Sequence, residues 1–194
     1  MLETTLELKM PRWLQEPETA LKPMREAAAR AMSVALVKHF RKKNRENPNA
    51  NGWKRSNYWS QVADSVTTRV EGNAAIAEIR KDGVRLHWLG GVVKPKPGHK
   101  ALAIPADPEV YGVWPSEWKG QGKKEKPFMV WREGEKTGFL AVKGSDPEHP
   151  RVLWWLTGAT HHQADESTLP ATDELAKTVQ RACKSVLRAL KGAE

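Results

Sequence analysis

The chain has 194 residues, of which 39% are hydrophobic and 28% charged, a composition typical of one globular domain, with or without a large insertion. It has no apolar run of the roughly 18 to 20 residues that cross a bilayer, so we expect no membrane-spanning helix and no membrane partner. The single cysteine, Cys183, excludes an intrachain disulfide, and the formal net charge of +9 either favours contact with nucleic acid or an acidic protein, or serves solubility alone.

The first 18 residues predict an N-terminal arm. They show no helical or strand period and contain Pro11 and Pro17. A disordered leader is the alternative. Apolar side chains in residues 1–18, Trp13 among them, can anchor such an arm on a neighbouring subunit.

Two helices are expected next. Apolar residues recur at three- and four-residue spacing from Leu21 to Asn44, which predicts a long amphipathic helix. Basic residues gather in its last turns, where they form either a solvated helix end or a patch that contacts phosphates. A short helix should follow, capped by Ser56 and extending to about Asp64.

Strands fill much of the middle of the chain. Residues 66–71 alternate in polarity, and a turn leads from them to a returning strand over 74–81, so these residues predict a hairpin. The segment 84–89 follows a further turn at Asp82-Gly83. More strands are expected over residues 101–104, 128–131, 139–142 and 152–157.

Residues 92–127 predict a basic, loop-rich insertion, because they hold much of the proline and glycine of the chain. The lysines of interest are Lys94, Lys96, Lys100, Lys123, Lys124 and Lys126. They can neutralise phosphates, and Trp114 and Trp118 can stack on bases, although no zinc finger or other nucleic-acid-binding motif is visible. A solvated loop is the alternative.

A second long helix is expected over residues 173–190, with Thr172 as its cap and Cys183 at the border of its buried stripe. The order of helix, strands and helix predicts the α+β class with an antiparallel sheet. We expect a single domain over residues 19–194 that carries the insertion around 92–127.

The sequence contains no recognised catalytic signature. The phosphate-binding loop, the dinucleotide-binding glycine pattern and the nucleophile elbow are all missing from it. Histidine and carboxylate neighbours at residues 160–166 can bind zinc, but adjacent His161 and His162 project in different directions, so a surface loop is expected there. We therefore predict no catalytic residue, no metal and no cofactor. A metal-dependent hydrolase that uses His161 or His162 is the alternative.

Four segments of the chain form an ordered pattern: N-Y-W-S at 57–60, A-A-I-A-E-I at 74–79, L-G-G-V-V-K-P-K at 89–96 and K-A-L-A-I-P at 100–105. Their order resembles that of phage virion morphogenesis proteins, also called tail-completion, tail-terminator or neck proteins. A late apolar strand, a polar loop with Leu169-Pro170 and a final helix extend the pattern, so the chain resembles this family over roughly residues 24–190. The stretch 106–150 departs from the shorter family members.

The resemblance implies a small α+β subunit with a curved antiparallel sheet packed against a long N-terminal helix and a C-terminal helix. It also implies a structural, non-enzymatic protein that forms a ring, commonly a hexamer, at the head-proximal end of the tail. The expected partners are the tail tube protein, head-side connector or neck proteins, and packaged DNA without sequence preference. The protein would belong to the virion, after assembly in the bacterial host cytoplasm.

Nine tryptophans suit such a subunit, because tryptophan is enriched at the centres of protein interfaces. The tryptophans expected to contact neighbouring subunits are Trp13, Trp53, Trp59, Trp114, Trp118 and Trp154. Neighbouring residues on a strand point to opposite faces, so one of Trp154 and Trp155 should lie in the core and the other in an interface or partly exposed. The basic loop would face the ring lumen, DNA or another ring. A sequence-independent DNA-binding protein is the alternative function.

Overall fold

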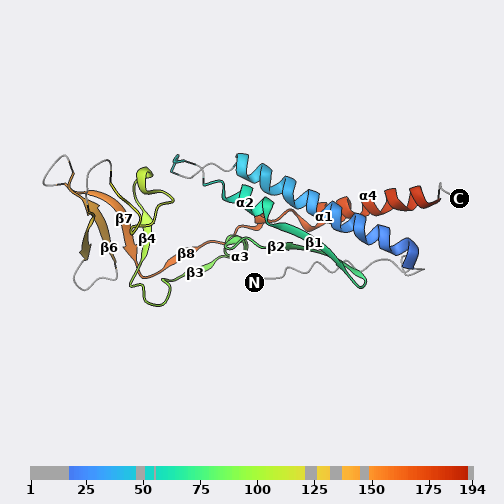
Figure 1. Ribbon diagram of the computed structural model, residues 1–194, viewed down its shortest axis with the longest axis horizontal. Helices are drawn as coiled ribbons and strands as arrows, with labels where there is room; N and C mark the ends of the chain where they lie inside the picture. The colour runs from blue at the N-terminus through green and yellow to red at the C-terminus, as the bar shows by residue number, and fades with distance from the viewer. Residues whose placement is uncertain are drawn as a thin grey trace. The chain divides into compact units, whose positions relative to one another are not determined.

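The computed structural model of the chain describes residues 18–46, 51–54, 56–120, 126–131, 137–144 and 149–191 (Figure 1). The chain divides into two compact units. Unit 1 draws on residues 1–48, 57–89 and 164–194, and unit 2 draws on residues 49–56 and 90–163. Residues 1–17, which include Trp13 and nearly all of the predicted arm, lie outside the described residues.

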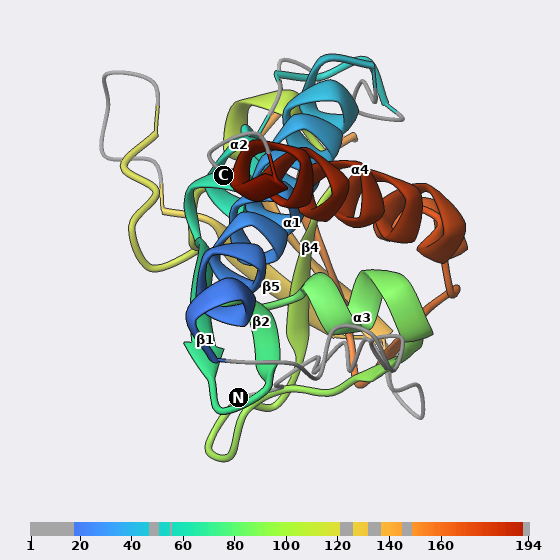
Figure 2. The same ribbon diagram turned by 90° about the vertical axis from the view of Figure 1, so that its right-hand side faces the viewer.

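The described residues of unit 1 form two long helices, two short helices, a 3-10 turn and a hairpin. In chain order they are α1 (Glu18–Glu46), α2 (Tyr58–Asp64), β1 (Val66–Glu71), β2 (Ala74–Ile79), α3 (Val84–Leu89), η3 (Glu166–Thr168) and α4 (Thr172–Lys191). The strands β1 and β2 pair antiparallel. Both the hairpin and α4 lie beside α1 (Figure 1, Figure 2).

Helix α1 contributes to both apolar clusters of unit 1. Its N-terminal half packs Met24 against Val179 and Cys183 of α4. Its C-terminal half places Phe40 parallel to Trp59 of α2, with 6.0 Å between the ring centroids. The three- and four-residue spacing of apolar residues along α1 therefore serves one long buried side of the helix.

The described residues of unit 2 form two antiparallel sheets. Its elements are β3 (Gly91–Val93), β4 (Leu102–Pro105), η2 (Pro108–Val110), β5 (Phe128–Trp131), β6 (Thr137–Val142), β7 (Arg151–Thr157) and β8 (Thr160–His162). A four-stranded sheet has the order β4-β7-β6-β5, and β3 pairs with β8 in a separate ribbon. The Arg151 guanidinium binds the Asp107 carboxylate at 2.7 Å and thereby ties η2 to β7.

The α+β class, both long helices and the strands predicted on either side of residues 84–89 are confirmed. The short segment 84–89 is a helix, α3. The cap of α2 is Asn57 rather than Ser56. Asn57 has a φ of 54°, a left-handed conformation that asparagine tolerates better than most residues. None of the described helices has both the length and the apolar character that a membrane span requires.

The predicted single domain with one sheet differs from the structure. Residues 90–163 form most of unit 2, a wider stretch than the predicted insertion at 92–127. The reason is that Val110, Leu153 and Trp154 build a separate core in this unit. In unit 1 the hairpin β1–β2 supplies the strands that pack against the long helices.

Candidate functional site

A row of apolar side chains crosses the four-stranded sheet of unit 2. Ile104 on β4 pairs with Trp155 on β7, Trp155 pairs with Phe139 on β6, and Phe139 pairs with Val130 on β5. Directly paired residues in an antiparallel sheet project from the same face, so these four form one line across the sheet, here called the apolar row. The rings of Phe139 and Trp155 meet edge to face, with centroids 6.0 Å apart.

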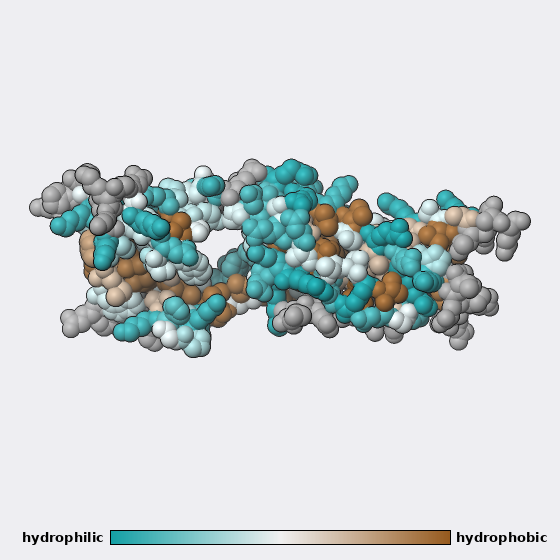
Figure 3. All heavy atoms as spheres, viewed as in Figure 1, coloured by the Kyte–Doolittle hydropathy of each residue, from teal (hydrophilic) through white to brown (hydrophobic). Residues whose placement is uncertain are grey.

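The apolar row is largely uncovered. Trp155 is 50% exposed and Ile104 is 37% exposed, while Phe139 and Val130 are half-buried. Phe128, two residues from Val130 on the same strand and so on the same face, is also exposed. Figure 3 shows apolar residues gathered on the visible surface of this sheet, at the left of the view. This exposed apolar surface is a candidate contact site for another macromolecule.

The opposite face of the sheet is the core of unit 2. Trp154 is only 1% exposed and packs with Leu153 and Val110. Trp118 lies edge to face against Trp154, at 6.1 Å between ring centroids. The alternation of strand side chains therefore separates Trp154 from Trp155, as the sequence predicts, and Trp155 is the exposed member of the pair.

The five predicted interface tryptophans within the described residues fall into three groups. Trp59 and Trp154 are buried in the cores of units 1 and 2, so the prediction that they contact neighbouring subunits is wrong. Trp53 and Trp118 are half-buried, and Trp53 packs edge to face on Tyr111. Trp114 is 68% exposed and stays an interface candidate.

Strand β5 is the part of this surface that the sequence analysis did not single out. Its four residues are all apolar, and three of them, Phe128, Met129 and Trp131, are exposed. Among the described strands it pairs with β6 alone, so it lies at an edge of the sheet. A run of four large apolar residues indicates a strand, but only the strand order reveals that one side of it is open.

Only some of the lysines of the predicted basic loop lie together in the structure. Lys94, Lys96 and Lys100 are exposed in the segment that links β3 to β4. Lys126 is exposed two residues before β5, and Lys123 and Lys124 lie outside the described residues. The lysines of residues 94–100 therefore share one loop, next to the β3–β8 ribbon.

The expected surface loop at residues 160–166 is corrected in part, because residues 160–162, with the histidine pair, form the strand β8, while residues 163–165 have no regular secondary structure. His161 is opposite Val92 and His162 is opposite Gly91 in the β3–β8 ribbon, because backbone pairing with β3 extends the chain there. Both side chains are exposed. In the part of the chain that the structure describes, no three histidine, cysteine or acidic side chains gather as a metal ion would require.

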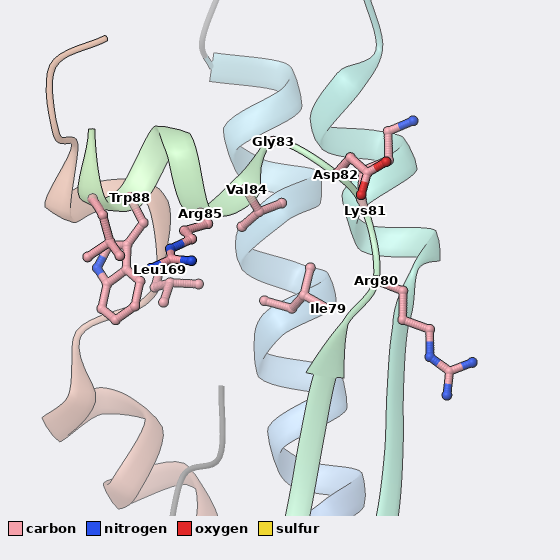
Figure 4. A pocket seen from close by; sticks show the side chains of 10 residues that line it. Ile79, Arg80, Lys81, Asp82, Gly83, Val84, Arg85, Trp88 and Leu169 are labelled. Atoms are coloured by element: carbon pink, nitrogen blue, oxygen red, sulfur yellow. The ribbon is translucent and has the colours of Figure 1, made fainter. Parts of the chain in front are cut away.

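Unit 1 has an open pocket of about 350 Å³ beside α3 (Figure 4). Trp88, Arg85 and Leu169 gather on one side of it, and Ile79 and Val84 line another side. The remaining lining residues are Arg80, Lys81, Asp82, Gly83 and Leu89. The Lys81 ammonium binds the side-chain oxygen of Gln61 at 2.7 Å, and the Arg80 guanidinium lies 3.2 Å from the Glu78 carboxylate. The lining combines apolar surface with three cationic side chains, of which Lys81 and Arg80 have the partners just named.

An ion pair joins α1 to the chain before α4. The Lys43 ammonium binds the Asp165 carboxylate at 2.8 Å and the Ser167 hydroxyl at 2.9 Å. It also lies 5.0 Å from the centre of the Trp59 ring. The hydrogen bond from Lys43, with that from Ser167, lowers the pKa of Asp165 to about 2. Nearby, burial and the charge of Asp82 raise the pKa of Tyr58 to about 12. These contacts stabilise the packing of unit 1.

Cys183 lies in the core, as predicted. It packs among Met24, Val179 and other apolar residues of α1 and α4, and burial raises the pKa of its thiol. The thiol lies 3.7 Å from the backbone oxygen of Met24, close enough for a weak hydrogen bond.

Comparison of the chain with known protein families, with curated proteins and with solved structures finds no match.

Proposed function

We propose that this chain is a structural subunit of a bacteriophage head–tail connection, a tail-terminator or tail-completion protein that forms a ring at the head-proximal end of the tail. The observation that carries the proposal is the apolar row on unit 2, whose exposed Trp155 and Ile104 need a protein partner to leave water. The segments between residues 57 and 105 occur in the same order as in phage virion morphogenesis proteins, and this resemblance indicates the class of the partner.

The proposed partners follow from this role. Copies of the chain form the ring, commonly six in this family, and the ring is positioned between the tail tube protein and head-side connector or neck proteins. We assign the apolar row to the contact with one of these neighbouring layers. Tryptophan at the centre of an interface contributes strongly to binding, because it buries a large area with little loss of conformational freedom.

A co-sedimentation experiment with tail tubes of the same phage tests this assignment. The wild-type chain is expected to sediment with the tubes, and Trp155→Ser is expected to reduce the bound fraction at least tenfold. Val92→Ser removes a similarly exposed apolar side chain of unit 2 outside the row, 49% exposed against 50% for Trp155, and serves as the control. Equal binding by the wild type and Trp155→Ser, or no binding by the wild type to tubes or neck proteins, would contradict the proposal.

Sequence-independent DNA binding is the second candidate function. It is favoured by the exposure of Lys94, Lys96 and Lys100 on one loop, within a stretch from residue 83 to 106 that contains no aspartate or glutamate. Each lost phosphate contact lowers the slope of log affinity against log salt by about 0.9 for duplex DNA, so replacing all three by glutamine should lower it by up to about 2.7.

The control for DNA binding replaces three exposed lysines of unit 1, Lys22, Lys177 and Lys184, by glutamine, which removes the same charge elsewhere. An equal fall in slope for both triple variants would show that total charge, and not this loop, governs binding.

A further inference from the structure

The two edges of the four-stranded sheet in unit 2 are formed by different strands of equal length. Strand β4 lies at one edge and β5 at the other, and each has four residues. Among the described strands each of them pairs with a single neighbour. The outer edge of such a strand leaves backbone N–H and C=O groups available to a strand from another chain.

Strand β5 lacks the usual protection of an edge. Natural edge strands are commonly shielded by lysine, by proline or by inward-pointing charges, and residues 128–131 contain none of these. Met129 is 63% exposed and Trp131 is 42% exposed on one face, while Phe128 is exposed on the other. Apolar side chains therefore stand open on both faces of an edge that no other described strand pairs with, and one added strand would cover part of each face.

The opposite edge of the same sheet supplies a strand of the right direction. All neighbouring strands in the order β4-β7-β6-β5 are antiparallel, so β4 and β5 also run in opposite directions. If the sheet of a second copy continues the first with the same face upward, its β4 lies antiparallel to β5. The sheets of two copies can therefore join edge to edge in the same orientation, and the two strands at the junction are antiparallel.

One register of this junction fits the side chains. When Val130 is opposite Ile104 of the next copy, both lie on the face of the apolar row, and the row continues across the junction. The same register places Trp131 opposite the small Ala103 on the other face, much as Trp131 is opposite Gly138 within its own sheet. Pro105 has no N–H to donate, so this junction has fewer backbone hydrogen bonds than a complete strand pairing. It therefore depends more on these side-chain contacts.

We propose that β5 of one copy pairs antiparallel with β4 of the next copy, so that the sheets of unit 2 join edge to edge. The inference rests on the proposed self-assembly and names the surface that performs it. Two different edges meet in this contact, so it is heterologous, and a heterologous contact repeated by rotation closes into a ring. Pairing of β5 with a second β5 would instead give a two-fold dimer.

Variants that block one edge each test the proposal. Met129→Lys places a charge at the β5 edge and Ile104→Lys places one at the β4 edge, and both residues are exposed, so both variants should fold. Thr137→Lys, on the interior strand β6, is the matched control. Circular dichroism checks the fold of each variant, and light scattering measures its mass.

The expected result is that the wild type and Thr137→Lys form closed oligomers while each edge variant alone is monomeric. An equimolar mixture of the two edge variants should give a dimer of about 44 kDa, twice the 21.8 kDa chain, because each retains the edge that the other lacks. Loss of assembly in Met129→Lys alone, with Ile104→Lys still dimeric, overturns the proposal in favour of two-fold β5 pairing.

Two further outcomes separate this inference from the proposed function. Edge variants that assemble like the wild type overturn the edge junction and leave the proposed ring in place. A wild-type chain that stays monomeric at every concentration, with and without tail tube protein, overturns both.

Discussion

Two adjacent tryptophans on β7 allow the arrangement of unit 2 to be tested by a matched pair of substitutions. Trp154 is 1% exposed and lies within the core, whereas Trp155 is 50% exposed. Trp154→Ala removes a fully buried ring and leaves a cavity, which costs about 3–5 kcal/mol. Trp155→Ala removes a half-buried ring and leaves no closed cavity, so we expect a cost of about 1.5 kcal/mol from lost apolar contact alone.

Urea denaturation followed by far-ultraviolet circular dichroism is the suitable assay, because each substitution alters the fluorescence of the chain. The expected difference of at least about 1.5 kcal/mol between the two variants corresponds to more than a tenfold change in the folding equilibrium. Trp155→Ala should also lose binding to tail tubes while it remains folded. Equal losses of stability, or a larger loss for Trp155→Ala, would refute the assignment of the two faces of the sheet.

Two further substitutions probe the contacts within each unit. Asp165→Asn should lower the free energy of unfolding by about 1 kcal/mol at pH 7, after allowance for its partial exposure to solvent, because it leaves the nine-tenths buried Lys43 without its carboxylate. Because the pKa of Asp165 lies near 2, below its ordinary 3.8, the stability difference from the wild type is present above about pH 4 and lost as the pH falls through 2. The control, Asp64→Asn at an exposed ion pair, should cost under about 0.5 kcal/mol. A stability difference for Asp165→Asn that does not change with pH would contradict this linkage. Gly138→Ala should lower the free energy of unfolding by about 1–3 kcal/mol, because the added Cβ would lie 2.6 Å from a backbone oxygen of β5. The control, Gly158→Ala, should have little effect, because its Cβ would meet nothing within 4 Å. Equal denaturation midpoints for the two variants would argue against the close approach of β5 to Gly138.

The sequence predicts the local elements well where a period extends over many residues. The apolar spacing from Leu21 to Asn44 is long enough to distinguish a helix from a strand, and α1 is observed there. Residues 84–89 are too few for either period to be visible, and they form α3. His161 and His162 carry no strand signal of their own, and their strand depends on pairing with β3 from a distant part of the sequence.

The candidate surface is harder to predict, because it depends on sheet order. Alternation along β7 indicates that Trp154 and Trp155 face opposite ways, but it does not say which of them faces the core. Val110 and Trp118 cover one face of the sheet, and the tryptophan on that face, Trp154, is therefore the buried one. Residue type alone predicts that Trp59 lies in an interface, yet its ring packs on Phe40 in unit 1.

The mass of the wild-type protein in solution, measured by light scattering over a range of concentrations and repeated with tail tube protein, tests the proposed ring most directly. The account predicts a closed oligomer whose mass is independent of concentration, about 131 kDa for six copies of the 21.8 kDa chain, either alone or once tail tube protein is added. A monomer that responds neither to concentration nor to tail and neck proteins would contradict it and favour the DNA-binding alternative.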